Sequence, residues 1–74
     1  MAYTLEVIGA DNRLICEEKL ELSSERDAWS YVVCCARRLK DGHGMRIRVR
    51  DETGGLLILT SVVAALLADQ ETAA

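Results

Sequence analysis

The sequence predicts an α+β domain: a four-stranded antiparallel sheet (ββαββ, strand order 2-1-3-4) with one main helix on one face and a short C-terminal helix. Three observations support this fold class. Residues 3–7 and 45–50 alternate apolar with polar side chains, as half-buried strands do. Residues 24–40 repeat apolar positions at helical spacing. Glycine-containing turns at 9–12 and 51–55 separate strand segments.

The first hairpin is predicted from residues 3–22. The first strand covers 3–7, the turn 9–12 contains residues that tolerate left-handed backbone, and the second strand begins at residue 13. The charged segment 17–19 interrupts the alternation, which predicts a bulge or a bend there. The side chains expected to point inward are Tyr3, Leu5, Val7, Leu14, Cys16, Leu20 and Leu22.

The main helix is predicted from Ser24 to about Lys40. Ser23 and Ser24 are favoured N-cap residues, and acidic residues follow in the first turn, where the helix dipole favours negative charge. Gly42 then supplies the stop. The stripe expected to face the sheet consists of Ala28, Trp29, Val32, Cys35, Ala36 and Leu39.

The second hairpin is predicted from strands at 45–50 and 56–60. In the first of these strands the polar positions are all arginine: Arg46, Arg48 and Arg50, termed the arginine ladder. In the second, Leu56 and Ile58 face one way and Leu57 and Leu59 the other. Ser61 is expected to cap a short helix over 62–68, and residues 69–74 to form a frayed tail. Residues 1–68 thus make a single compact domain.

Size and charge limit the functions that can be expected. A 74-residue chain has room for one small core, and chains of this size often need a disulfide, a metal or a second subunit for stability. The net charge is −3. Residues 37–50 carry six basic groups and one acidic group, so they form a basic segment between acidic flanks.

Certain segments resemble a known family. Glu21-Leu22 leading into a helix rich in alanine and arginine, and the closing hairpin around residues 50–54, resemble a family of very small uncharacterised bacterial proteins with strand-strand-helix-strand-strand order. The resemblance covers roughly residues 3–60 and implies the fold alone. The family has no assigned activity, so the resemblance implies no site residue.

The arginine ladder is a candidate anion-binding site. Such a ladder can contact phosphates, which makes a nucleic-acid-associated protein the alternative function. The interpretation that we favour is a solvated sheet face whose charges meet carboxylates on a neighbouring strand, with Glu6 well placed for that. Sheet-type RNA binders also use aromatic side chains on the same face, and the sequence offers none there.

Catalytic and metal sites are not expected. The three cysteines cannot complete a disulfide framework within one chain. Cys34 and Cys35 diverge by about 100° on a helix, so they cannot share a zinc ion, and Cys34 should be the exposed thiol. His43 lies between glycines, where it cannot be held beside a nucleophile. We therefore expect no enzyme, no metal and no cofactor.

The leucine-rich segment 56–59 provides the main functional prediction. A strand that is apolar on both sides needs two covers, and one helix supplies only one. The second cover is either the C-terminal helix or a second subunit, and the sequence leaves both open. The candidate interface residues are Leu57, Leu59, Val62, Val63, Leu66 and Leu67.

The expected function is therefore a non-enzymatic interaction or regulatory module. It is predicted to form a homodimer through the fourth strand and the C-terminal helix, with another protein as a further possible partner. The apolar stretch 56–68 is shorter than the roughly 20 residues of a membrane span, and no secretory leader is recognisable at the N-terminus. We accordingly expect no membrane association and a cytoplasmic location.

Overall fold

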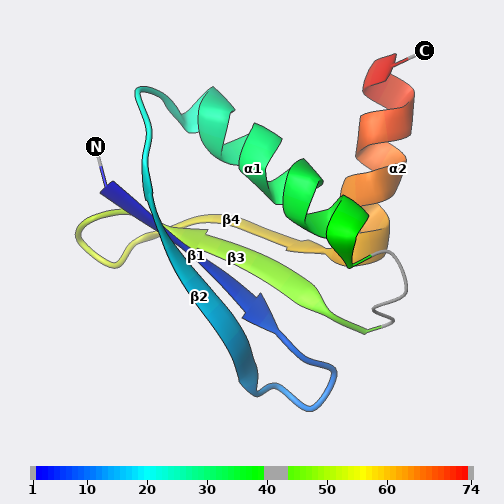
Figure 1. The fold of residues 1–74 in the computed structure, drawn as a ribbon, viewed down its shortest axis with the longest axis horizontal. Coiled ribbons are helices and arrows are strands. Elements are labelled where there is room, and N and C mark those ends of the chain that lie inside the picture. The colour runs from blue at the N-terminus through cyan, green and yellow to red at the C-terminus, as the bar shows by residue number, and fades with distance from the viewer. Residues whose placement is uncertain (1, 40–43, 74) are drawn as a thin grey trace.

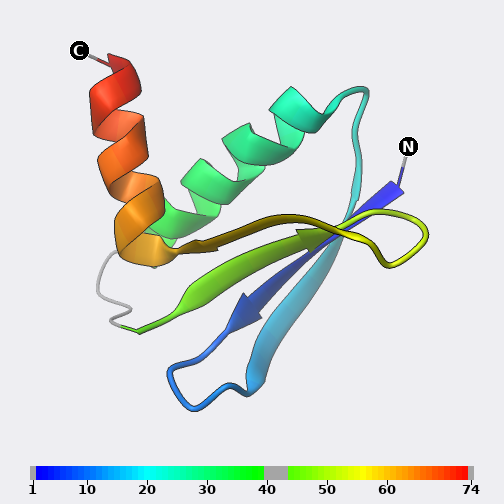
Figure 2. The ribbon, with the colours of Figure 1, turned by 180° about the vertical axis from the view of Figure 1, so that it is seen from behind.

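A computed structural model describes residues 2–39 and 44–73, and Figures 1 and 2 show it from opposite sides. The described residues form β1 (Ala2–Ile8), β2 (Leu14–Glu21), α1 (Glu25–Arg38), β3 (Arg46–Arg50), β4 (Leu56–Ser61) and α2 (Val62–Ala73). The strands of this part of the chain make one antiparallel sheet in the order β2-β1-β3-β4. The predicted fold class and strand order are confirmed.

The core lies between α1 and the two central strands. Tyr3, Leu5 and Val7 of β1 and Ile47 and Val49 of β3 are each at most 3% exposed, as their alternation predicts. Burying a side chain of this size contributes about 1.5–3 kcal/mol. The buried residues of α1 are Ala28, Val32, Val33, Cys35 and Ala36. Trp29 and Leu39 of the predicted stripe are partly buried against this cluster.

Helix α1 is slightly shorter than predicted. Ser24 is the N-cap residue, but its side chain makes no capping hydrogen bond, and Ser23 Oγ instead donates to Asp27 Oδ2 at 2.8 Å. At the other end the Leu39 amide donates to the carbonyls of Cys35 and Ala36, both at 3.1 Å. Lys40 and Gly42, the predicted end and stop, lie outside the described residues.

Strand β2 differs from the prediction in its bulge and in its burial. Val7 pairs with Cys16 and Ile8 with Leu14, so the extra residue is Ile15, whereas segment 17–19 pairs regularly with β1. The bulge shifts Leu14 to the face opposite α1, where it is 52% exposed. Cys16 stays on the α1 side but is exposed. The predicted burial of Leu14 and Cys16 is therefore wrong.

An uncovered region beside β2 explains the exposure of Cys16. A hollow of about 260 Å³ separates this part of β2 from the end of α1. It is lined by Leu5, Val7, Cys16, Glu18, Cys35, Arg38 and Leu39. One helix therefore covers the central strands but does not reach across the outer half of β2.

A second bulge changes the faces of β4. Ile58 pairs with Val49, whereas Leu56 pairs with Arg50, so Leu57 is the extra residue. Antiparallel partners share a face, which puts Leu56 with Leu59, beside the arginine ladder, and Ile58 on the core side. Leu57 is partly buried against the core. The predicted grouping of Leu57 with Leu59 is therefore wrong.

Helix α2 begins where β4 ends. The Ala64 amide donates to Ser61 Oγ at 3.0 Å, which confirms Ser61 as the cap. The helix continues to Ala73 instead of ending at residue 68, so residues 69–73, predicted as part of a frayed tail, are helical. Neither glycine nor proline interrupts this segment. Residue 74 lies outside the described part of the chain.

Helix α2 lies on the same side of the sheet as α1, close to the C-terminal end of α1 (Figure 1). Val62 and Ala65 are at most 1% exposed and belong to the main core. The Val62 amide also donates to the Met45 carbonyl at 3.1 Å. The opposite face of the sheet, termed the open face, carries the ladder and is therefore not covered by α2.

Candidate functional site

The open face is organised around Glu6 of β1. Glu6 pairs with Arg48 across the β1–β3 ladder, and its Oε1 accepts from Nε of Arg48 at 2.8 Å and from Nε of Arg50 at 3.0 Å. The Glu6 side chain is only 12% exposed. The Arg48 hydrogen bond, together with the two positive charges, holds the pKa of Glu6 below its ordinary value although burial opposes the shift. The predicted pairing of the ladder with Glu6 is confirmed.

The other ladder contacts lie at the two hairpin turns. Arg46 donates through Nη2 to Oδ1 of Asn12 in the β1–β2 turn. Arg50 donates through Nη1 to the Gly54 carbonyl at 3.2 Å in the β3–β4 turn. Among these contacts only Glu6 is anionic. Arg48 and Arg50 share its carboxylate, whereas Arg46 contacts a neutral amide, so the ladder and its contacts together carry a positive excess.

The candidate interface residues separate into two groups. Leu59, Val63 and Leu67 are 54%, 49% and 55% exposed, so they face solvent in the single chain. Leu57 and Leu66 are partly buried against the core, and Val62 is fully buried in it. The structure adds Leu56, which is 57% exposed on the open face. A strand bulge brought Leu56 there, and alternation alone could not reveal it.

The two edges of the sheet have contrasting chemistry. β2, at one edge, carries Glu17, Glu18, Lys19 and Glu21, all exposed. β4, at the other edge, has the sequence LLILTS and no charged residue. Charges on an edge strand discourage pairing with another chain, and an apolar edge lacks this protection.

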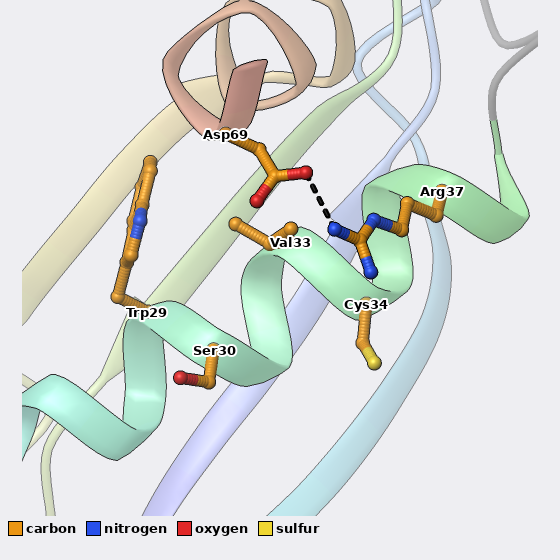
Figure 3. A pocket seen from close by; sticks show the side chains of 6 residues that line it. All are labelled: Trp29, Ser30, Val33, Cys34, Arg37 and Asp69. Atoms are coloured by element: carbon orange, nitrogen blue, oxygen red, sulfur yellow. Dashed lines mark hydrogen bonds and ion pairs between the residues drawn. The ribbon is translucent and has the colours of Figure 1, made fainter. Parts of the chain in front are cut away.

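A shallow hollow lies between α1 and α2 (Figure 3). It has a volume of about 370 Å³ and is lined by Trp29, Ser30, Val33, Cys34, Arg37 and Asp69. Arg37 Nη2 of α1 donates to Asp69 Oδ2 of α2 at 2.6 Å, and this bond raises the pKa of Arg37. Figure 3 shows the Cys34 side chain directed away from Asp69.

Sequence reasoning missed this contact between the helices. The stripe predicted to face the sheet does not include Arg37, and Asp69 belongs to the segment predicted as a frayed tail. The available signal was Asp69 itself. A carboxylate directly after the apolar segment 62–68 is expected to pair with a long basic side chain of a neighbouring element. Packing of α2 against α1 also buries Val33, which lies outside the predicted stripe.

The thiols do not gather into a site. Cys34 is exposed, as predicted, and Cys35 is buried, which raises the pKa of its thiol. Across residues 2–39 and 44–73, no three His, Cys, Asp or Glu side chains are placed to hold a metal ion. His43 lies outside those residues. What the described site offers is charge pairing and apolar contact.

Comparisons with known proteins add no relative. No protein-family model matches the chain, and neither curated proteins nor solved structures yield a match. In the part of the chain that the structure describes, neither helix combines the length and apolar character needed to cross a bilayer. The fold and the surfaces described above are therefore the basis for any functional inference.

Proposed function

We propose that this protein is a non-enzymatic interaction module that forms a symmetric homodimer through the outer edge of β4, assisted by the outer side of α2. The observation that carries the proposal is the uncharged, leucine-rich edge strand. Its free side presents a row of backbone donors and acceptors next to Leu56 and Leu59, both more than half exposed. Such an edge readily pairs with another strand.

A second copy is the partner that fits this edge most simply. Two β4 strands related by a two-fold axis can pair in antiparallel fashion, and each then covers the same surface of the other. The two sheets would join into one, with the apolar side chains of both edges in contact across the axis. The charged edge strand β2 lies at the far side of each sheet and stays outside this interface.

The composition of α2 supports the same assignment. Residues 62–68 of α2 are apolar on every side, whereas residues 69–72 are polar, and a helical segment that is apolar all round is normally buried all round. α2 buries Val62 and Ala65 in the core, yet Val63 and Leu67, four residues apart on its outer side, remain about half exposed. Because α2 begins directly after β4, a partner at the β4 edge can reach this side of the helix.

Nucleic-acid binding is less well supported. Arg48 and Arg50 direct their Nε groups to Glu6 of the same chain. Tyr3 is buried in the core, and Trp29 and Tyr31 belong to α1. These contacts favour the solvated-face role of the ladder over the stacking and phosphate contacts that single-stranded nucleic acids require.

Sedimentation equilibrium tests the homodimer with a matched pair of variants. Leu59→Glu places a carboxylate opposite Arg48, which the single chain tolerates, but brings like charges towards each other when two β4 edges pair. We expect the dimer dissociation constant to rise at least about tenfold, as loss of about 1.4 kcal/mol requires. The control Ile15→Glu alters an equally exposed side chain on β2 and should leave the dimer dissociation constant unchanged.

Two results would contradict the proposal. One is a wild-type protein that sediments as a single chain at several hundred micromolar. The other is a dimer that Ile15→Glu weakens as much as Leu59→Glu does, because the interface would then not lie at β4. Circular dichroism of both variants establishes that each retains the fold.

A further inference from the structure

We infer that the open face of each chain holds a binding site for a small organic acid, namely a carboxylate carried on an apolar chain of several carbons. The site is a hollow of about 330 Å³ above β1 and β3. This volume lies at the lower end of the range of small-molecule sites, about 300–1,000 Å³. Its lining residues are Ile8, Asn12, Leu14, Arg46, Arg48 and Leu59.

Strand register brings these residues together. Ile8 pairs with Leu14 on one side and with Arg46 on the other, which places these three side chains in one row across the open face. Arg48 pairs with Leu59 in the next row. The hollow therefore has two guanidinium groups at its centre, with Leu14 and Leu59 on opposite sides of them.

The guanidinium groups retain the capacity to bind an anion. Arg46 is paired with Asn12, a neutral amide, so its charge is not balanced by that contact. Arg48 uses Nε for Glu6, and its two terminal NH₂ groups carry four further donors. Glu17, which pairs with Glu6 from β2, is exposed and does not line the hollow. An incoming carboxylate can accept paired hydrogen bonds from such a group.

The apolar walls decide which kind of anion fits. Leu14 and Leu59 are 52% and 54% exposed, and a bare phosphate or acetate would leave both in water. A neutral hydrocarbon would cover the leucines but would take water from the guanidinium groups without replacing their hydrogen bonds. A carboxylate with a medium-length alkyl chain satisfies both requirements, because its head reaches the arginines while its chain covers a leucine.

Of its lining residues, this site shares Leu59 with the proposed homodimer interface, and the others lie on β1, β2, β3 or the β1–β2 turn. Every lining residue comes from one chain, and Arg46 lies on β3, away from the β4 edge. Binding to the hollow and pairing of the edges can therefore each fail without the other. Sedimentation of Arg46→Gln alongside the wild type distinguishes failure of the binding site from failure of the homodimer.

Titration of ¹⁵N-labelled protein with octanoate tests the inference, with octanol and acetate as matched probes. We expect backbone amide shifts centred on residues 8, 14, 46, 48 and 59, and a dissociation constant for octanoate at least about tenfold lower than for either probe. Octanol lacks the charge-assisted hydrogen bonds to the arginines, and acetate lacks the alkyl chain that covers a leucine. Equal affinity for octanol and octanoate would overturn the inference, and so would shifts that map elsewhere.

A pair of arginine variants tests whether the Arg46 guanidinium itself contributes to octanoate binding. Arg46→Gln removes a guanidinium of the hollow whose hydrogen bond is to a neutral turn residue, so the fold should persist, and octanoate should bind about tenfold more weakly. Arg13→Gln removes an equal charge near the same turn, where Arg13 is paired with Asp11 and is 86% exposed. Equal weakening by both variants would show general charge attraction and would overturn the site.

Discussion

Glu6 is the residue on which the charges of the open face depend. It is nearly buried, and its single Oε1 accepts from both Arg48 and Arg50. Without it, Arg48 and Arg50 would lose the carboxylate that both of their Nε groups share. These two hydrogen bonds stabilise the arginine-rich strand β3 in the sheet. The terminal NH₂ groups of Arg48 are the donors that remain for a ligand.

Replacement of Glu6 by glutamine should make stability less dependent on pH. The pKa of Glu6 is lowered on folding from an ordinary value of 4.5, so ionised Glu6 stabilises the fold above that value, and this contribution is lost as pH falls through the lowered pKa. At pH 7 we expect Glu6→Gln to reduce the free energy of unfolding by about 1–2 kcal/mol. Urea denaturation at several pH values measures the difference.

The pH dependence of the difference in unfolding free energy distinguishes a charge-pairing role of Glu6 from simple packing. The gap between Glu6→Gln and the wild type should shrink as the pH falls from 4.5 through the lowered pKa of Glu6, because below that pKa protonated glutamic acid and glutamine are both neutral. Glu18→Gln on the exposed part of β2 is the control and should track the wild type. A gap of constant size from pH 7 to pH 3 would contradict the role assigned to Glu6.

The three thiols should react at different rates. Cys16 and Cys34 are exposed, whereas Cys35 is 8% exposed and burial raises its thiol pKa. Because the thiolate is the nucleophile, iodoacetamide should modify Cys16 and Cys34 well before Cys35 in the folded protein. Peptide mass spectrometry follows each site, with urea-unfolded protein as the control. Modification of all three at one rate in the folded state would show that Cys35 is not shielded.

The two helices depend on their N-caps to different degrees. Ser61 accepts the Ala64 amide, whereas Ser24 makes no such bond although it occupies the equivalent position of α1. The sequence predicts both as caps with equal ease. Only the position of the preceding chain decides whether the hydroxyl reaches the helix, and for α1 the neighbouring Ser23 bonds to Asp27 instead.

Alanine variants of the two serines should therefore differ in stability. Ser61→Ala should lower the free energy of unfolding by about 1 kcal/mol, the usual value for a lost N-cap. Ser24→Ala should change it by less than about 0.5 kcal/mol, as surface substitutions do. Thermal and urea denaturation of both proteins provide the comparison. Equal losses would mean that the Ser61 hydrogen bond contributes nothing specific.

At the scale of the whole molecule, the described residues form a single-layered sheet with α1 and α2 on one side. It therefore has one open face and two edges, and its three most distinctive surfaces lie there: the ladder, the charged edge of β2 and the apolar edge of β4. A small domain of this kind gains stability from any surface that it can share. The edge without charges is the one at which we propose that a second copy pairs.

Amide hydrogen exchange tests whether the β4 edge pairs with a second chain. If β4 pairs with a second β4, exchange at its amides should slow as protein concentration rises from micromolar to several hundred micromolar, because outward-facing amides become hydrogen-bonded. Amides of β2 should show no such dependence, and Leu59→Glu should abolish it in β4. Concentration-dependent protection at β2 instead would move the interface to the other edge.

The amino-acid sequence by itself determined the fold class, the order of the strands and the central core. Alternation in β1 and β3 and the helical stripe of α1 are local properties, and they identify which side chains share a face. It also placed Glu6 opposite the ladder correctly, because residues of one parity on neighbouring strands meet on the same face.

Only the tertiary structure decided which of those faces are covered. One extra residue at Ile15 and another at Leu57 reverse the faces of the residues beyond them, and nothing in the alternation marks either position. The reach of α1 left Cys16 exposed, and the packing of α2 beside α1 left Leu56 and Leu59 uncovered. Periodicity specifies how a segment is divided into faces, but burial depends on what other segments lie against each face.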